Sequence, residues 1–166
     1  LLLCWKHLRL PKPTKIQYRI ARFLQEGDRR RAIQGYRGVG KSWITAAYCL
    51  WRLLRDPDSR ILVVSASKGR ADDFSSFCLR LITDWAVLSP LRPEPGQRWS
   101  MLAFDVGGAG NAQQPSVSSK GINSQLTGSR AGIIIFDDCE IPNNSATQDL
   151  RDKLKKKMAE AEAIIP

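Results

Sequence analysis

The stretch that decides the fold runs from residue 35 to residue 42 and reads Gly35-Tyr36-Arg37-Gly38-Val39-Gly40-Lys41-Ser42. It fits the pattern G-x-x-x-x-G-K-[ST] at every specified position. That pattern is typical of a loop that wraps a triphosphate with backbone N–H groups, and glycine permits both the strained dihedral angles and the close approach of phosphate. We therefore interpret residues 35–42 as a nucleotide-binding phosphate loop, or P-loop.

Two side chains of this loop have defined roles in that interpretation. Lys41 would reach the β- and γ-phosphates, and the Ser42 hydroxyl would bind Mg²⁺. The loop lies between a short strand that we expect at Arg31–Gln34 and a helix that we expect at Lys41–Leu54. Because the N-terminus of a helix is itself an anion site, this context strengthens the interpretation. The motif thus predicts a nucleoside triphosphate and Mg²⁺ as ligands.

A second motif follows farther along the chain, where the apolar run Ile133–Phe136 ends in Asp137 and Asp138. An apolar strand that ends in a carboxylate places this group at the carboxyl edge of the sheet, where phosphates sit in open α/β folds. There Asp137 can hold Mg²⁺. Hydrolysis also needs a carboxylate that orients or deprotonates the attacking water. Asp138 and Glu140 are both candidates, and the choice between them stays open.

Strand-like and helix-like stretches alternate along the rest of the chain. Ile61–Ser65 is a continuous apolar run, typical of a strand covered on both faces. Weakly alternating patterns predict strands at Ser100–Val106 and Ser116–Ile122, and Gly132–Phe136 is another run typical of a buried strand. Helices are expected at Thr14–Gln25, at Ala71–Leu88 and from Ser145 to about Ala163. The alternation favours an α/β fold with a mostly parallel sheet flanked by helices. Because the chain ends on apolar residues, we expect a fold that is cut short before its last strands.

The composition is that of a globular domain. The chain has 166 residues, of which 43% are hydrophobic and 25% charged, which excludes collagen-like and disordered classes. No apolar stretch is long enough to span a bilayer, and the start of the chain lacks the features of a signal peptide, so we expect an intracellular fragment that begins upstream. The four cysteines lack metal-ligand spacing and are expected to be reduced core residues.

The net charge of +10 is concentrated near the N-terminus. Residues 1–60 carry 14 Lys and Arg against 4 Asp and Glu. Such a basic stripe favours a polyanionic partner, nucleic acid before an anionic membrane. Lys68 and Arg70 follow an expected strand end and are further candidates for contacts to a DNA backbone. The runs Arg29–Arg31 and Lys155–Lys157 are interpreted as solvated faces, and the five tryptophans as core residues.

Upstream of the P-loop, Pro13-Thr14-Lys15-Ile16-Gln17 resembles the Q motif of superfamily-2 helicases. In that motif a glutamine amide reads adenine with one donor and one acceptor, which makes Gln17 a candidate for nucleotide binding. The alternative is an ordinary exposed glutamine on a helix.

Several sequence motifs taken together resemble those of the large terminase subunits of tailed bacteriophages, most closely the DNA maturase B branch of short-tailed, podovirus-type phages. They are the P-loop, residues 61–68, residues 125–131, residues 137–142 and residues 144–147. These motifs occur in the same order as in the family and at compatible spacing, over nearly the whole chain from Pro13 onward.

This resemblance implies a P-loop NTPase domain of the RecA-like, additional-strand class. Residues 31–166 would form its incomplete core, residues 1–30 a basic lead-in with the Q-motif-like helix, and a ribonuclease H-like nuclease domain would lie outside this chain. The implied activity is ATP hydrolysis that drives double-stranded DNA into a procapsid in the host cytoplasm. The implied partners are a portal protein, a small terminase subunit and further copies of the chain docked on the portal, with no membrane.

The resemblance also bears on single residues. Arg37 matches an arginine found inside the P-loop of several large terminases, where it is a candidate charge sensor for the γ-phosphate; otherwise it contacts a neighbouring carboxylate. Many family members carry glutamate directly after the strand-terminal aspartate, whereas this chain has Asp138. The shorter carboxylate leaves room for Glu140 to take the catalytic role.

Two other functions remain open from the sequence alone. One is a superfamily-2 helicase-like DNA translocase that separates strands. The other is a non-catalytic DNA-binding or assembly module, because a missing core strand would leave this fragment with an incomplete and inactive site.

Overall fold

The computed structural model describes residues 1–126 and 128–165. Thr127, which belongs to the family-like stretch 125–131, and Pro166 lie outside the described residues. The chain divides into two compact units, Leu1–Arg52 and Leu53–Pro166. The expected division into a lead-in at residues 1–30 and a core at residues 31–166 stays a prediction.

The first unit is helical. It contains α1 (Leu2–His7), α2 (Lys15–Glu26) and most of α3 (Lys41–Arg55). A capping box starts α2, because the Thr14 hydroxyl accepts a hydrogen bond from the Gln17 N–H while the Gln17 side chain accepts one from the Thr14 N–H. The predicted helices at 14–25 and 41–54 are confirmed, and α1 was not predicted.

The prediction of a strand at Arg31–Gln34 is wrong. These residues carry no strand assignment, and among the described residues the sheet contains no strand that pairs with them. A strand exists only through its ladder of hydrogen bonds to a neighbour, so an apolar pattern without a partner remains irregular.

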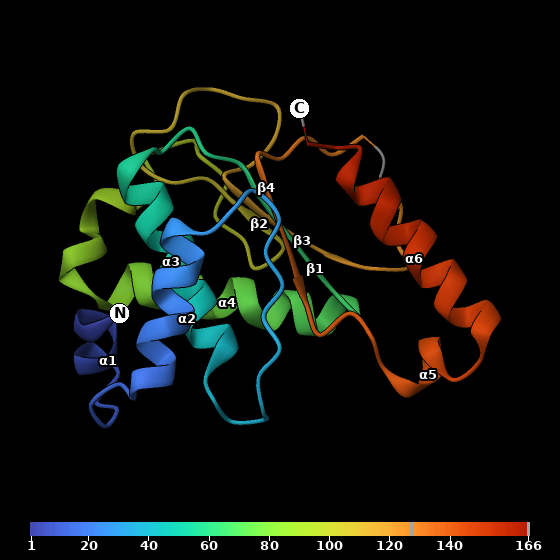
Figure 1. Ribbon diagram of the computed structural model, residues 1–166. Coiled ribbons are helices and arrows are strands. Elements are labelled where there is room, and N and C mark those ends of the chain that lie inside the picture. Colours follow the sequence, from blue (N-terminus) through green and yellow to red (C-terminus); the bar gives the residue numbers. More distant parts are fainter. Residues whose placement is uncertain (127, 166) are drawn as a thin grey trace. The chain divides into compact units, whose positions relative to one another are not determined.

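The second unit contains a four-stranded sheet with the order β2-β3-β1-β4 (Figure 1). Its strands are β1 (Ile61–Ser65), β2 (Ala103–Phe104), β3 (Val117–Gly121) and β4 (Ile133–Asp137). β1 pairs in parallel with both β3 and β4, and the short β2 pairs antiparallel with β3. The expected α/β class is confirmed, but the sheet is small and mixed.

Two helices cover opposite faces of this sheet (Figure 1). On one face, α4 (Lys68–Asp84) packs on β1 and β3, and the Ser119 hydroxyl donates a hydrogen bond to Asp72 of that helix over 2.7 Å. The other face is covered by α6 (Gln148–Glu162), whose Ala161 is buried in one hydrophobic cluster with Leu62 and Val64 of β1. Because successive strand residues point to opposite faces, the fully buried β1 packs against both helices.

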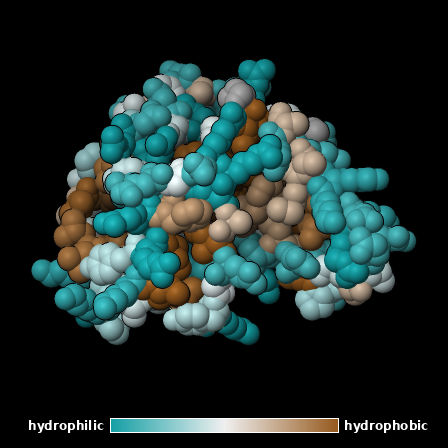
Figure 2. Space-filling view, viewed as in Figure 1, coloured by the Kyte–Doolittle hydropathy of each residue, from teal (hydrophilic) through white to brown (hydrophobic). Residues whose placement is uncertain are grey.

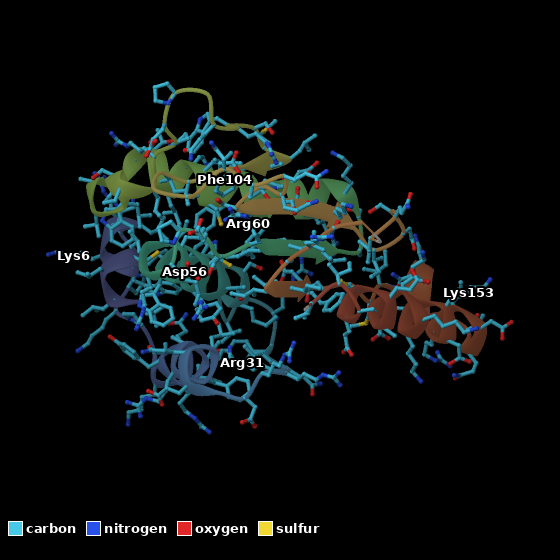
Figure 3. The ribbon with its side chains drawn as sticks, turned by 90° about the horizontal axis from the view of Figure 1, so that it is seen from above. Lys6, Arg31, Asp56, Arg60, Phe104 and Lys153 are labelled. Atoms are coloured by element: carbon cyan, nitrogen blue, oxygen red, sulfur yellow. The ribbon has the colours of Figure 1, made fainter. Side chains whose placement is uncertain are left out.

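The helix α6 has one apolar side and one charged side. Leu154 and Met158 pack against the core cluster, whereas Lys153, labelled in Figure 3, lies on the exposed side. Hydrophilic side chains cover the region of α6 in Figure 2. Of the two N-cap candidates that the sequence offers, Ser145 and Thr147, the structure uses Thr147, whose hydroxyl accepts a hydrogen bond from the Leu150 N–H.

Three expectations about the middle of the chain need correction. The helix expected at 71–88 begins earlier and ends at Asp84, after which a 3₁₀ turn, η1 (Ala86–Leu91), contains Pro90. Proline lacks an N–H, so a regular helix cannot continue through it. The strand expected at 100–106 shrinks to the two residues of β2. Of the tryptophans, Trp5 is 3% exposed, but Trp43 and Trp99 are 42% and 44% exposed and are not core residues.

All four cysteines are buried, which confirms their prediction as core residues, and their thiols are free in the structure. In the described part of the chain, no group of three or more His, Cys, Asp or Glu side chains could hold a metal ion by itself. Among the helices of the described residues, none is long and apolar enough to cross a membrane.

Candidate nucleotide site

The P-loop lies in the first unit and leads directly into α3. Gly38 and Gly40 have φ angles of +88° and +84°, in the left-handed region that glycine adopts readily and other residues adopt at a cost. A Cβ atom at Gly38 would meet nothing within 4 Å. Gly38 is therefore required for its backbone angle rather than for space. The helix starts at Lys41, so its N-terminus, the end of the helix dipole that favours anions, lies at the end of the loop.

Lys41 closes this loop on itself. Its ammonium group donates a hydrogen bond to the carbonyl oxygen of Gly35 over 3.2 Å, which links the first and the seventh residue of the motif. Val39 is 2% exposed and anchors the loop, whereas Tyr36 is 65% exposed. Arg37 is exposed and Ser42 is half-buried. The buried Val39 side chain thus holds the loop in place, while the side chain of Arg37 is exposed to solvent.

Gln17 ties α2 to the P-loop. Its side-chain amide nitrogen donates to the carbonyl oxygen of Val39 over 3.0 Å, while its amide oxygen accepts the Thr14 N–H over 2.9 Å. Each of these amide atoms can form a further hydrogen bond. A role in reading adenine therefore stays a prediction, and the structure shows a second use of this residue that the sequence did not indicate.

Trp5 is a further contact that no motif marked. A Cβ atom at Gly40 would lie 3.6 Å from its ring and 3.5 Å from the Gln17 amide nitrogen. The ring also meets Trp43 of α3 edge-on, with centroids 6.2 Å apart. The short helix α1 and the helix α2 thus back the P-loop in this unit.

The carboxylates gather in the second unit, in the turn that follows β4. Asp137 is the last residue of that strand and is half-buried, whereas Asp138 and Glu140 are exposed. Asp138 has a φ of +46°, which is uncommon for a residue with a side chain. Backbone strain of this kind clusters at active sites and ligand clamps. Asp137 pairs in register with Ser65, so the turn lies at the same sheet edge as the start of α4.

At that edge, Lys68 forms an ion pair with Asp72 over 2.7 Å. Asp72 also accepts the Ser119 hydroxyl, so the ammonium group of Lys68 belongs to a small polar network. A DNA contact by Lys68 or by the exposed Arg70 stays a prediction.

Cys139 anchors the carboxylate turn to the core. Its thiol donates to the carbonyl oxygen of Val64 over 3.2 Å, and the residue is 6% exposed. Burial, together with the negative charges of Asp137 and Asp138, raises the pKa of the Cys139 thiol from 9.0 to about 12. The neutral thiol therefore stabilises the fold at any pH below about 9, and this contribution is lost as the pH rises toward 12.

We expect the Cys139 thiol to resist alkylation in the native protein. At pH 8.5 its thiolate fraction is on the order of 10³-fold lower than that of an unfolded cysteine. Native alkylation by iodoacetamide, followed by peptide mass spectrometry, should be at least about 100-fold slower than in denaturant. Equal rates in both conditions would contradict the buried anchor.

Two comparisons with known proteins bear on this site. The family model described as "Terminase large subunit, T4likevirus-type, N-terminal" matches residues 33–164. A curated protein named "Terminase, large subunit", from Enterobacteria phage T3, is 52% identical over 166 residues. The match covers 99% of this chain and 28% of that relative, so the chain spans little more than a quarter of the relative's length.

Proposed function

Because this chain belongs to the family of terminase large subunits, we propose that it is the ATPase part of a phage DNA-packaging motor. Both matches confirm the resemblance to large terminase subunits that the sequence motifs indicated. The observation that carries the proposal is the P-loop, in which Gly38 and Gly40 adopt positive φ angles and Lys41 opens α3. These residues fit a triphosphate, because the loop offers backbone N–H groups, a helix N-terminus and an ammonium group to one anion.

The proposed reaction is the in-line attack of water on the γ-phosphorus of ATP, in which the bond to the β,γ-bridging oxygen breaks and ADP leaves as phosphate forms. The backbone of residues 35–40 would cradle the phosphates, and Lys41 and Arg37 would stabilise the charge on the transferring group. Ser42 and Asp137 would hold Mg²⁺, which supplies neutralisation of charge on the phosphate oxygens. One carboxylate of the turn after β4, Asp138 or Glu140, would orient the water.

The proposal extends to the partners of the full-length protein. Double-stranded DNA is the substrate to be moved, and the first 60 residues supply the basic charge that favours it. A portal protein, a small terminase subunit and further copies of the chain complete the motor in the host cytoplasm. The domain plan, with residues 1–30 as lead-in and residues 31–166 as an incomplete ATPase core of the RecA-like class, belongs to the same proposal.

The test is ATP turnover by the full-length protein with and without linear double-stranded DNA. Turnover that rises with DNA, and falls again as salt increases, supports a packaging motor. Turnover that is indifferent to DNA would leave an ATPase but remove the motor. Separation of a forked duplex would favour the helicase-like translocase, and no turnover of any kind would favour an assembly module.

Gln17→Ala is expected to weaken nucleotide binding. The variant loses the hydrogen bond to Val39 that holds the P-loop, and one such bond contributes about 1 kcal/mol, or roughly fivefold in an equilibrium constant. We expect the Kd for a non-hydrolysable ATP analogue to rise about fivefold in titration calorimetry. Gln25→Ala, at an exposed position of the same helix, is the control and should leave the Kd unchanged.

The same variant separates the two roles of Gln17. A residue that only holds the loop affects ATP and GTP equally, because both carry the same triphosphate. Loss of discrimination between ATP and GTP would instead support the reading of adenine by the amide. A Kd within twofold of the parent for both nucleotides would contradict both roles.

A further inference from the structure

The turn after β4 is held around one residue, Glu140. The side-chain nitrogen of Asn144, in the short helix α5 (Pro142–Ser145), donates to the carbonyl oxygen of Cys139 over 2.8 Å. Its side-chain oxygen accepts the Ile141 N–H, also over 2.8 Å. Cys139 and Ile141 are the two neighbours of Glu140. One amide group therefore bridges the peptide groups on both sides of that residue.

The same turn is fixed to the sheet at its other end. The Cys139 thiol donates to the carbonyl oxygen of Val64 in β1, the strand at the centre of the parallel pairs. The backbone that carries Glu140 is thus tied both to the central strand and to α5. The Glu140 side chain, by contrast, is exposed and can approach a ligand at this edge of the sheet.

The chemistry of this bridge requires an amide. One end of the side chain must donate to a carbonyl oxygen and the other must accept from an N–H, which asparagine does with its two terminal atoms. Aspartate has the same shape but offers only acceptors when ionised, so one of its oxygens would face the Cys139 carbonyl oxygen. A role in packing would tolerate that exchange, whereas the bridge would not.

We infer that Asn144 is a positioning residue that holds Glu140 as the carboxylate that orients the attacking water. This inference rests on the proposed ATPase function. It goes beyond that function by choosing Glu140 over Asp138 and by assigning a role to a residue outside the P-loop and the aspartate pair. A catalytic group that is misplaced by about 1 Å can lose up to about 100-fold in rate, so a backbone held on both sides has a direct kinetic consequence.

The test compares Asn144→Ala and Asn144→Asp in the full-length protein, with Asn143→Ala as the matched control. Asn143 is the adjacent residue of α5 and is exposed. We expect both Asn144 variants to lower kcat for ATP about tenfold while the Kd for nucleotide stays within about twofold. The control should keep the kcat of the parent.

A double-mutant cycle distinguishes positioning from a general loss of structure. In the Glu140→Gln background, Asn144→Ala should cause no further loss of kcat, because the group that it positions is already disabled. A further tenfold loss in that background, or coupling to Asp138→Asn instead, would overturn the inference. If Lys41→Ala retains turnover, the ATPase proposal itself fails. If Glu140→Gln alone retains turnover, only the role of Glu140 and its positioning by Asn144 fail.

Discussion

Lys41→Ala is expected to lower ATP turnover of the full-length protein by at least about 10³-fold. In the proposed site the ammonium group would supply a positive charge to the β- and γ-phosphates, and its contribution would grow in the transition state as charge develops on the transferring group. In the structure this side chain donates a hydrogen bond to the Gly35 carbonyl oxygen, and it is half-buried. Its removal therefore affects the reaction far more than the fold.

The measurement is steady-state release of phosphate in the presence of linear double-stranded DNA. Lys153→Ala is the matched control, because Lys153 is an exposed lysine of α6 that has no part in the proposed site. The control should turn over like the parent. We expect the thermal unfolding midpoint of Lys41→Ala to stay within a few degrees of the parent. Turnover within twofold of the parent would show that residues 35–42 are not a catalytic P-loop.

Local patterns predicted those parts of the fold in which each residue's environment follows from its neighbours in sequence. Ile61–Ser65 was predicted within its bounds because five successive residues are buried on both faces of a central strand. The helices α2 and α6 were predicted because their apolar residues recur on one side, and the structure shows that Thr14 and Thr147 cap them. In these elements the local signal and the tertiary environment agree.

The predictions that were wrong concern features that depend on parts of the chain distant in sequence. Arg31–Gln34 has the pattern of a strand, but a strand also needs a partner, which no local pattern reports. The exposed Trp43 and Trp99 show that residue type alone does not decide burial. The candidate site divides in the same way. The roles of residues 35–42 and of the aspartate pair are predicted from sequence spacing and stay predictions. The Gln17–Val39 and Cys139–Val64 bonds, by contrast, join residues 22 and 75 positions apart and depend on the folded chain.

Glu140→Gln and Asp138→Asn are expected to differ in ATP turnover by more than tenfold. We expect Glu140→Gln to lower kcat by about 10²- to 10³-fold, as the loss of a general base does. Asp138→Asn should lower it by less than about tenfold. Both exchanges keep the shape of the side chain and remove its charge, so the comparison isolates the carboxylate that acts on water.

The structure makes this pair of variants easy to interpret. Asp138 has a φ of +46°, and asparagine is one of the few residues with a side chain that adopts such angles readily, so Asp138→Asn leaves the backbone of the turn in place. Glu140 is exposed, so glutamine there creates neither a cavity nor a buried polar group without a partner. A tenfold or larger loss in Asp138→Asn alone would assign the water to Asp138. Small and equal effects in both variants would mean that neither carboxylate orients it.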